Sequence, residues 1–162
     1  HGESTTSPDQ AGKLMMALEI AETERDLRAA IQYLLASPSV KGTQVGTVGF
    51  CMGGQLSLYA ACENRAVGAA VDFYGVHPHV SLAIEKLTAP VLGFFAGRDA
   101  MVTRAVADEL ETRLRAAGKA ATFHHYEAAQ HGFFNDTRPV HDPVAADDAW
   151  KKLLAFFRAH LS

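Results

Sequence analysis

Apolar residues in the first quarter of the chain recur at the spacing of an amphipathic helix. The predicted apolar face consists of Leu27, Ile31, Leu34 and Leu35. Steps of three, four and seven residues place side chains on one side of a helix. The helix should end at Ser37, because the proline that follows disfavours helical geometry in the residue before it. Residues 1–10 are polar and rich in turn formers, which predicts a loose lead-in.

Four short apolar runs further along the chain predict β-strands. They span residues 45–50, 66–74, 90–96 and 121–126. Apolar runs without alternation are typical of strands that are buried on both faces of a parallel sheet. Helical patterns separate these runs, so strand and helix alternate four times. We therefore predict an α/β fold with a mostly parallel sheet between layers of helices.

Cap residues place the helices between and after these strands. One helix should start near Met52, and another should run from Thr103 as N-cap to Gly118 as C-cap. The second is expected to bury Val106, Leu110 and Leu114. Asp142 and Pro143 form the predicted start of a last helix. Its expected apolar stripe contains Trp150, Leu153, Leu154, Phe157 and Leu161.

Length, composition and charge narrow the class of protein. The chain has 162 residues, 48% of them hydrophobic and 20% charged, as in a globular protein, and suits a single domain. A net charge of −3 without a basic stripe argues against nucleic acid as a partner. No apolar run reaches the ~20 residues of a membrane span, and no secretory signal is evident. Two cysteines make no disulfide framework and favour a reducing, cytoplasmic location.

The strongest chemical motif is a glycine-flanked cysteine between a predicted strand and a predicted helix. Residues 49–54 read Gly-Phe-Cys-Met-Gly-Gly, the pattern of a nucleophile elbow with Cys51 in place of serine. Such a tight turn strains the nucleophile, and Gly49 and Gly53 are expected to avoid a collision across it. The Met52 amide should point toward an oxyanion, and the helix N-terminus should lower the pKa of the thiol. A buried structural cysteine in a glycine-rich turn is the alternative interpretation.

Two further residues follow successive predicted strands. Asp99 comes directly after the run ending at residue 96, and His131 lies beyond the run ending at residue 126. The carboxyl ends of parallel strands meet at one edge of a sheet, where α/β proteins place their functional groups. Taken singly, each residue fits an ordinary loop position. Nucleophile, acid and histidine in this order, however, match the arrangement of a Cys51–Asp99–His131 catalytic triad.

Other candidates carry weaker signals. Phe73, Tyr74, His77 and Phe133 are candidates for a substrate pocket, although packing is the more common role of such aromatic positions. Cys62 is interpreted as a packed core thiol. The neighbouring histidines at 77 and 79, and at 124 and 125, have no metal-ligand spacing, and adjacent strand residues point to opposite faces. No metal site is predicted.

These motifs resemble those of the dienelactone hydrolase (carboxymethylenebutenolidase) family of α/β-hydrolases. The likeness rests on GFCMGG, PVLGFFAGRD and HGFFND, and extends from about residue 26 to residue 161. It implies an α/β-hydrolase fold with Cys51 as nucleophile, Asp99 as orienting acid and His131 as base. It also implies hydrolysis of an ester or lactone without a metal or organic cofactor. The family's arginine shortly after the histidine is not matched, since Arg138 is the nearest one, so dienelactone itself is not assumed as substrate.

The N-terminal part of the family fold is not found in this sequence. Members of the family usually have several strands and a helix before the matched region, which contribute a second oxyanion donor and a carboxylate near the nucleophile. We therefore expect a single domain that is incomplete at its N-terminus, and His1-Gly2 is interpreted as a scar. The strand at residues 45–50 should then lie at an open edge of the sheet, which is a hazard for pairing.

Three functional hypotheses remain at this point. The first is a hydrolase that cleaves a small-molecule ester or lactone through an acyl-thioester. The second is a non-catalytic binding or regulatory module that keeps the fold. The third is a redox role for Cys51, although no resolving cysteine is near it in the sequence. Neither nucleic acid nor membrane is expected as a partner, and a homodimer is left open.

Overall fold

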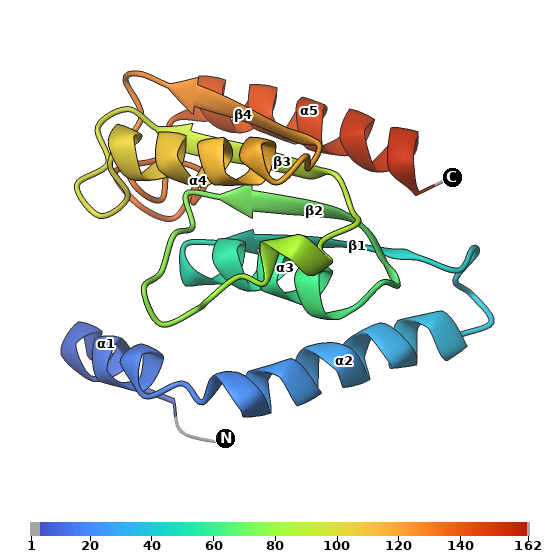
Figure 1. Ribbon diagram of the computed structural model, residues 1–162. Helices are drawn as coiled ribbons and strands as arrows, with labels where there is room; N and C mark the ends of the chain where they lie inside the picture. Colours follow the sequence, from blue (N-terminus) through green and yellow to red (C-terminus); the bar gives the residue numbers. More distant parts are fainter. Residues whose placement is uncertain (1–3, 162) are drawn as a thin grey trace.

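The computed structural model describes residues 4–161 and consists of a four-stranded parallel sheet with helices on both faces (Figure 1). The elements, in chain order, are α1 (Pro8–Met16), α2 (Ile20–Ala36), β1 (Val45–Phe50), α3 (Met52–Glu63), β2 (Val67–Phe73), the 3₁₀ turn η1 (Ile84–Lys86), β3 (Val91–Ala96), α4 (Arg104–Ala116), β4 (Ala121–Tyr126) and α5 (Pro143–His160). The predicted alternation of strand and helix is found except between β2 and β3, where the connection contains the short 3₁₀ turn η1 in place of an α-helix.

The strands lie side by side in their chain order, β1-β2-β3-β4, and all neighbouring pairs are parallel. β1 and β4 have the predicted bounds, while β2 and β3 lack the first residue predicted for each, and β2 also lacks the last. Because the strands are parallel, their carboxyl ends lie at one edge of the sheet. The loops that follow β1, β3 and β4 carry the candidate catalytic residues, so these loops emerge at the same edge.

Two layers of apolar side chains hold the helices against the sheet. On one face, residues of α2, α3 and α4 pack against β1, β2 and β3 around a core that includes Leu58, Val67 and Leu110. On the other face, α5 packs against β2 and β3 around Val71, Phe94 and Leu153. Each strand is therefore covered by helices from one or both sides, as a parallel sheet requires.

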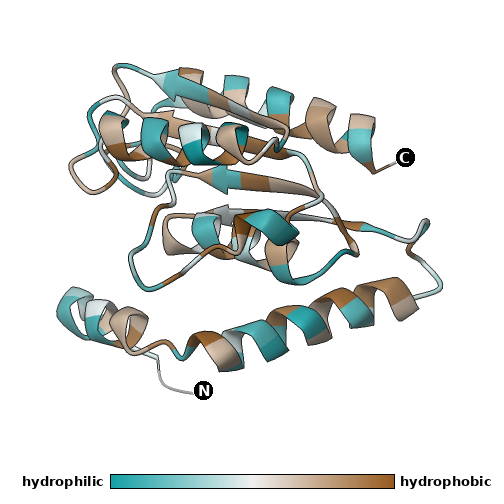
Figure 2. Cartoon of the chain, in the orientation of Figure 1, coloured by the Kyte–Doolittle hydropathy of each residue, from teal (hydrophilic) through white to brown (hydrophobic). Residues whose placement is uncertain are grey.

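The N-terminal segment differs in part from its prediction. The last three residues of the lead-in expected over residues 1–10 are helical, because α1 begins at Pro8, where proline suits the first turn of a helix. The His1-Gly2 pair, interpreted above as a scar, lies outside the described residues. Within α2, Ile31 is buried, but Leu34 is 44% exposed and does not share the buried face. Hydrophobic and hydrophilic segments alternate along this helix in Figure 2. α2 thus contacts the rest of the domain along a narrow stripe.

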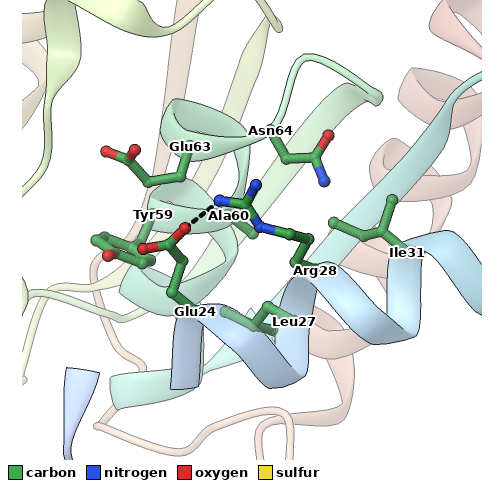
Figure 3. Close-up of a pocket in the computed structure, with 8 residues that line it drawn as sticks. All are labelled: Glu24, Leu27, Arg28, Ile31, Tyr59, Ala60, Glu63 and Asn64. Atoms are coloured by element: carbon green, nitrogen blue, oxygen red, sulfur yellow. Dashed lines mark hydrogen bonds and ion pairs between the residues drawn. The ribbon is translucent and has the colours of Figure 1, made fainter. Parts of the chain in front are cut away.

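A small pocket marks where α2 meets α3 (Figure 3). Its lining residues are Glu24, Leu27, Arg28, Ile31, Tyr59, Ala60, Glu63 and Asn64. Arg28 pairs with Glu24 one turn earlier on α2, as the dashed line in the figure marks. The lining comes from α2, α3 and the residue that ends α3, and not from the loops that carry the candidate catalytic residues.

The predicted caps are found at the ends of the later helices. Asp142 Oδ1 accepts hydrogen bonds from the amides of Val144 and Ala145 and caps α5. Thr103 is the N-cap residue of α4, but its side chain makes no capping bond. Gly118 has a φ of +70°, the left-handed geometry that favours glycine after a helix. Trp150 is 46% exposed, so it lies at the margin of the predicted stripe on α5.

β1 forms an edge of the described sheet, as the sequence predicts. Its one strand neighbour in residues 4–161 is β2. Val48 and Phe50 of β1 are 45% and 41% exposed, which is unusual for apolar side chains in a parallel sheet. Between residues 4 and 161, no helix has the length and apolar character that crossing a membrane would require.

Candidate active site

Cys51 occupies a sharp turn between β1 and α3. Its φ of 55° and ψ of −130° are strained for a residue with a side chain. The turn is fixed from both sides, because the Cys51 amide donates to Phe73 O at 2.9 Å and the Cys51 carbonyl accepts from the Gly54 amide at 2.8 Å. The strained elbow predicted from the glycine-rich motif is therefore found at this cysteine.

The glycines around the elbow do not all have the predicted role. A Cβ on Gly49 would lie 1.8 Å from the carbonyl oxygen of Gly53, so glycine is required at position 49. A Cβ on Gly53 would meet nothing within 4 Å, which corrects the expectation that this residue also avoids a collision. Gly54 is the constrained residue of the helix, since a Cβ there would lie 2.0 Å from Asp72 Oδ1.

Asp99 and His131 meet at the carboxyl edge of the sheet. Asp99 Oδ2 lies 2.7 Å from His131 Nδ1, and the side chain of Asp99 is fully buried. The other carboxylate oxygen accepts from the amides of Met101 and Val102 at 2.7 and 2.9 Å. These three contacts fix the carboxylate, which in turn fixes the imidazole with Nδ1 toward the acid.

The second imidazole nitrogen is directed away from Asp99. His131 Nε2 is buried, and no partner within residues 4–161 meets hydrogen-bond geometry with it. Interaction with Cys51 is nevertheless the largest cause of a raised pKa at His131, and interaction with His131 is the largest cause of a lowered pKa at Cys51. These opposite shifts favour the ionised form of each group. Catalytic contacts of this kind are often loose before substrate binds.

The backbone around Cys51 adds a smaller electrostatic effect. Burial opposes the lowered pKa of the thiol, whereas a hydrogen bond from the Met52 amide supports it. The predicted influence of the helix N-terminus is therefore present in the first amide of α3, but it ranks behind His131. An amide that can donate to a thiolate at this position can also donate to an oxyanion that forms beside the sulfur.

The four candidate pocket residues lie in different environments. Phe73 and Phe133 are fully buried in the core between the sheet and α5, so the prediction that they line a pocket is corrected. Tyr74 is nearly buried, and its ring centroid lies 4.9 Å from that of His131. His77 lines a cavity of about 470 Å³ between the loop after β2 and α4. That cavity also contains Glu109 and Arg113 of α4.

Asp72 is a buried acid beside the elbow that was not among the residues predicted from the sequence. It lies on β2 with no exposed surface and has Gly49 of β1 and Gly93 of β3 as its register partners. Burial raises its pKa well above the ordinary value, and the charge of Cys51 raises it further. The available signal was a single acidic residue inside an otherwise apolar strand, since buried acids are rare without a partner.

Cys62 and the histidines add little to the site. Cys62 is buried in the core, and burial raises the pKa of its thiol to about 11, which suits the predicted structural role. Asp108, Glu111 and His125 hold potential metal ligands within 4.8 Å of one another. Both carboxylates are already engaged, however, by Arg104 at 3.0 Å and by Arg115 at 2.6 Å respectively.

Comparison with known proteins places this geometry in context. A model of the "Dienelactone hydrolase family" matches residues 1–161. A protein of Methylorubrum extorquens with the name "Putative carboxymethylenebutenolidase" is 34% identical over 86% of this chain. A protein of the same name from Saccharolobus solfataricus is 33% identical over 93%. The crystal structure of a "Putative Dienelactone Hydrolase" from Klebsiella pneumoniae subsp. pneumoniae shares 27% identity with a TM-score of 0.85.

The chain corresponds to only part of each of these proteins. It spans 51% of the Methylorubrum protein and 59% of the Saccharolobus protein. It covers 68% of the Klebsiella chain, while 96% of its own length is superimposed. The similarity therefore concerns the segment that carries Cys51, Asp99 and His131.

Proposed function

Because this chain belongs to the dienelactone hydrolase family, we propose that it hydrolyses a carboxylic ester or lactone with Cys51 as nucleophile, His131 as general base and Asp99 as the orienting acid. The observation that carries the proposal is the 2.7 Å contact between Asp99 and His131 next to the strained Cys51. The opposite pKa shifts of Cys51 and His131 support the same roles.

Acylation begins with the thiolate of Cys51, which attacks the substrate carbonyl carbon. A carbon–sulfur bond forms and the carbonyl electron pair moves to the oxygen, where the Met52 amide donates a hydrogen bond. When the oxyanion collapses, the bond to the alcohol oxygen breaks, and that oxygen takes the proton from Nε2 of the His131 imidazolium. The acyl group is then held on sulfur as a thioester, and Asp99 keeps the imidazole in its productive tautomer.

Deacylation uses water as the second nucleophile. Neutral His131 accepts a proton from the water while the water oxygen attacks the thioester carbon. Collapse of this second oxyanion breaks the carbon–sulfur bond, releases the carboxylic acid and returns Cys51 as the thiolate beside protonated His131. With a lactone, the alcohol and acid are the two ends of one ring-opened product.

Turnover of the chromogenic ester p-nitrophenyl acetate tests the proposal. Cys51→Ala should abolish turnover, and His131→Ala should reduce it by about 10²-fold or more, as expected for loss of a general base. Cys62→Ala is the matched control, because it removes the other thiol from the core and should leave turnover unchanged. Intact mass of the quenched wild type should reveal the acetyl group on Cys51.

The second hypothesis, a non-catalytic binding module, makes the opposite prediction. Wild type and Cys51→Ala would then release nitrophenol at the same rate, and no acetylated protein would accumulate. That result would reject the hydrolase proposal while leaving the family assignment intact.

The cellular setting is also a proposal. Cys51 and Cys62 are both free thiols, and one of them is the proposed nucleophile. A reducing compartment such as the cytoplasm would preserve that nucleophile. Association of two copies of the chain through the exposed edge of β1 is a further proposal.

A further inference from the structure

The proposed mechanism makes no use of Asp72, although this acid is fully buried beside the elbow. Its Oδ1 accepts a hydrogen bond from the Gly75 amide at 2.8 Å, whereas Oδ2 is buried without a hydrogen-bond partner in the described chain. A buried acid with so few contacts needs an explanation, because burial of polar groups without partners costs free energy.

Two glycines make room for this carboxyl group. A Cβ on Gly54 of α3 would lie 2.0 Å from Asp72 Oδ1, and a Cβ on Gly75 would lie 2.6 Å from the same atom. A Cβ on Gly75 would also lie 2.3 Å from the carbonyl oxygen of Cys51. The Asp72 side chain therefore fills the space where the first turn of α3, the elbow and the turn after β2 converge.

The turn after β2 connects Asp72 to His131. The contact between Asp72 and Gly75 closes this turn around Tyr74, whose φ of 46° is unfavourable for a residue with a side chain. The Tyr74 ring lies against the His131 ring, with centroids 4.9 Å apart and planes inclined at 58°. Asp72 can thus influence the imidazole through Tyr74 without touching it.

The surroundings of Asp72 favour its uncharged form. Among residues 4–161, no Lys, Arg or His forms an ion pair with it, and an isolated buried carboxylate is costly. A negative charge at this position would also oppose the proposed thiolate at Cys51. A neutral carboxyl can still accept the hydrogen bond from Gly75.

We propose that Asp72 is a positioning residue of the nucleophile elbow, whose uncharged carboxyl fixes the Tyr74 turn and thereby the His131 imidazole that activates Cys51. This inference rests on the proposed function, because it assigns Asp72 a role in the same site. Asp72 touches neither the thiol nor the imidazole in a described hydrogen bond, so it acts through Tyr74.

The test uses two substitutions of Asp72 in the full chain with Cys62→Ala, so that Cys51 is the only thiol. Asp72→Ala removes the acceptor of the Gly75 amide, and Asp72→Asn keeps an uncharged acceptor of the same shape. The first readout is the pH dependence of Cys51 alkylation by iodoacetamide, which needs no ester substrate. The second is kcat and KM with p-nitrophenyl acetate.

Asp72→Ala should lower kcat by about 10²-fold with little change in KM, which is the loss expected when a catalytic group is displaced by about 1 Å. The pH midpoint of Cys51 alkylation should rise, because a displaced imidazole stabilises the thiolate less well. Asp72→Asn should restore both properties. Tyr74→Ala, which removes the ring but not the closing hydrogen bond, should reproduce the loss even if Asp72→Ala does not fold.

Ser57→Ala is the matched control for a merely structural effect. Ser57 is buried on α3, and its Oγ donates to Thr47 Oγ1 at 2.9 Å, away from the elbow. Its loss should lower stability without moving the alkylation midpoint. The inference would be overturned if Asp72→Asn shifted that midpoint, which would require a charged Asp72, or if Tyr74→Ala left it unchanged. Absence of ester turnover in the wild type would reject the proposed function alone, since alkylation would still report on positioning.

Discussion

At the scale of single residues, the proposed chemistry depends on transfer of a proton from the Cys51 thiol to the His131 imidazole. His131 is the largest cause of the lowered pKa of Cys51, and burial of the thiol acts in the opposite direction. Without the imidazole, burial should therefore raise the pKa of Cys51. We predict that His131→Ala in the Cys62→Ala background slows alkylation of Cys51 at neutral pH by about tenfold for each unit of pKa increase.

The measurement is the rate of iodoacetamide alkylation across a pH series, followed by intact mass. Arg138→Ala serves as control, because this exposed residue also follows the histidine loop but has no part in the pKa shifts of the thiol. An alkylation profile that stays in place after loss of His131 would show that the helix end alone sets the reactivity of Cys51.

Asp72 gives a second prediction at this scale, this time for stability. Its pKa in the folded protein is raised well above the ordinary value of 3.8, so the folded state keeps a proton that the unfolded state releases. The free energy of unfolding should then decrease as pH rises above the ordinary value, because folding requires proton uptake. Asp72→Asn has no carboxyl group to titrate, so its free energy of unfolding should lack this contribution to the decrease with pH.

The measurement is the urea midpoint of unfolding of wild type and of Asp72→Asn at several pH values. The difference between the two midpoints at each pH reports on Asp72, because the other titrating groups contribute almost equally to both proteins. The wild type should lose stability relative to the variant as pH rises. If the wild type instead gained stability relative to Asp72→Asn over this range, the carboxyl would be ionised in the folded protein.

At the scale of secondary structure, the packing of α3 against the sheet leaves room for a Cβ at Gly53 but not at Gly54. Ala at position 54 would place its Cβ 2.0 Å from Asp72 Oδ1, whereas Ala at position 53 would meet nothing within 4 Å. Gly54→Ala should therefore lower the free energy of unfolding by about 1–3 kcal/mol, as overpacking does. Gly53→Ala should be neutral or slightly stabilising, because alanine favours the helix by up to about 1 kcal/mol over glycine.

Chemical denaturation of both variants checks this pair of expectations, and each variant is the control for the other. Equal losses at the two positions would mean that the first turn of α3 requires glycine for its backbone geometry. Equal tolerance would mean that Asp72 can move away from position 54.

The same helix illustrates what the sequence could and could not predict. Strands and helix starts were predictable because apolar runs and cap residues are local signals, and Cys51 stood out through its flanking glycines. The constraint at Gly49 was predictable from the motif, but the one at Gly54 was not, since the clash there comes from Asp72 on β2. Similarly, the burial of Phe73 and Phe133 depends on α5, which covers them from the end of the chain.

At the scale of the whole molecule, the open edge of β1 is the feature with the largest consequence. Val48 and Phe50 are exposed on this strand. The ring of Phe50 packs against that of Phe134, which in turn packs against the half-exposed Trp150. An apolar strand edge with one neighbour in the described sheet is a template for pairing with another chain. We therefore expect the chain to self-associate as its concentration rises.

Val48→Glu should weaken this association, because a charge on an edge strand opposes pairing. Val144→Glu is the control: it replaces an equally apolar and more exposed residue, 78% accessible, in the first turn of α5, where an acidic side chain is tolerated. Sedimentation velocity over a concentration series should show assembly in wild type and Val144→Glu, and less of it in Val48→Glu. If all three sedimented as monomers, the β1 edge would be protected in solution by its own twist or by neighbouring side chains. If both glutamates had the same effect, general surface hydrophobicity would govern association rather than this edge.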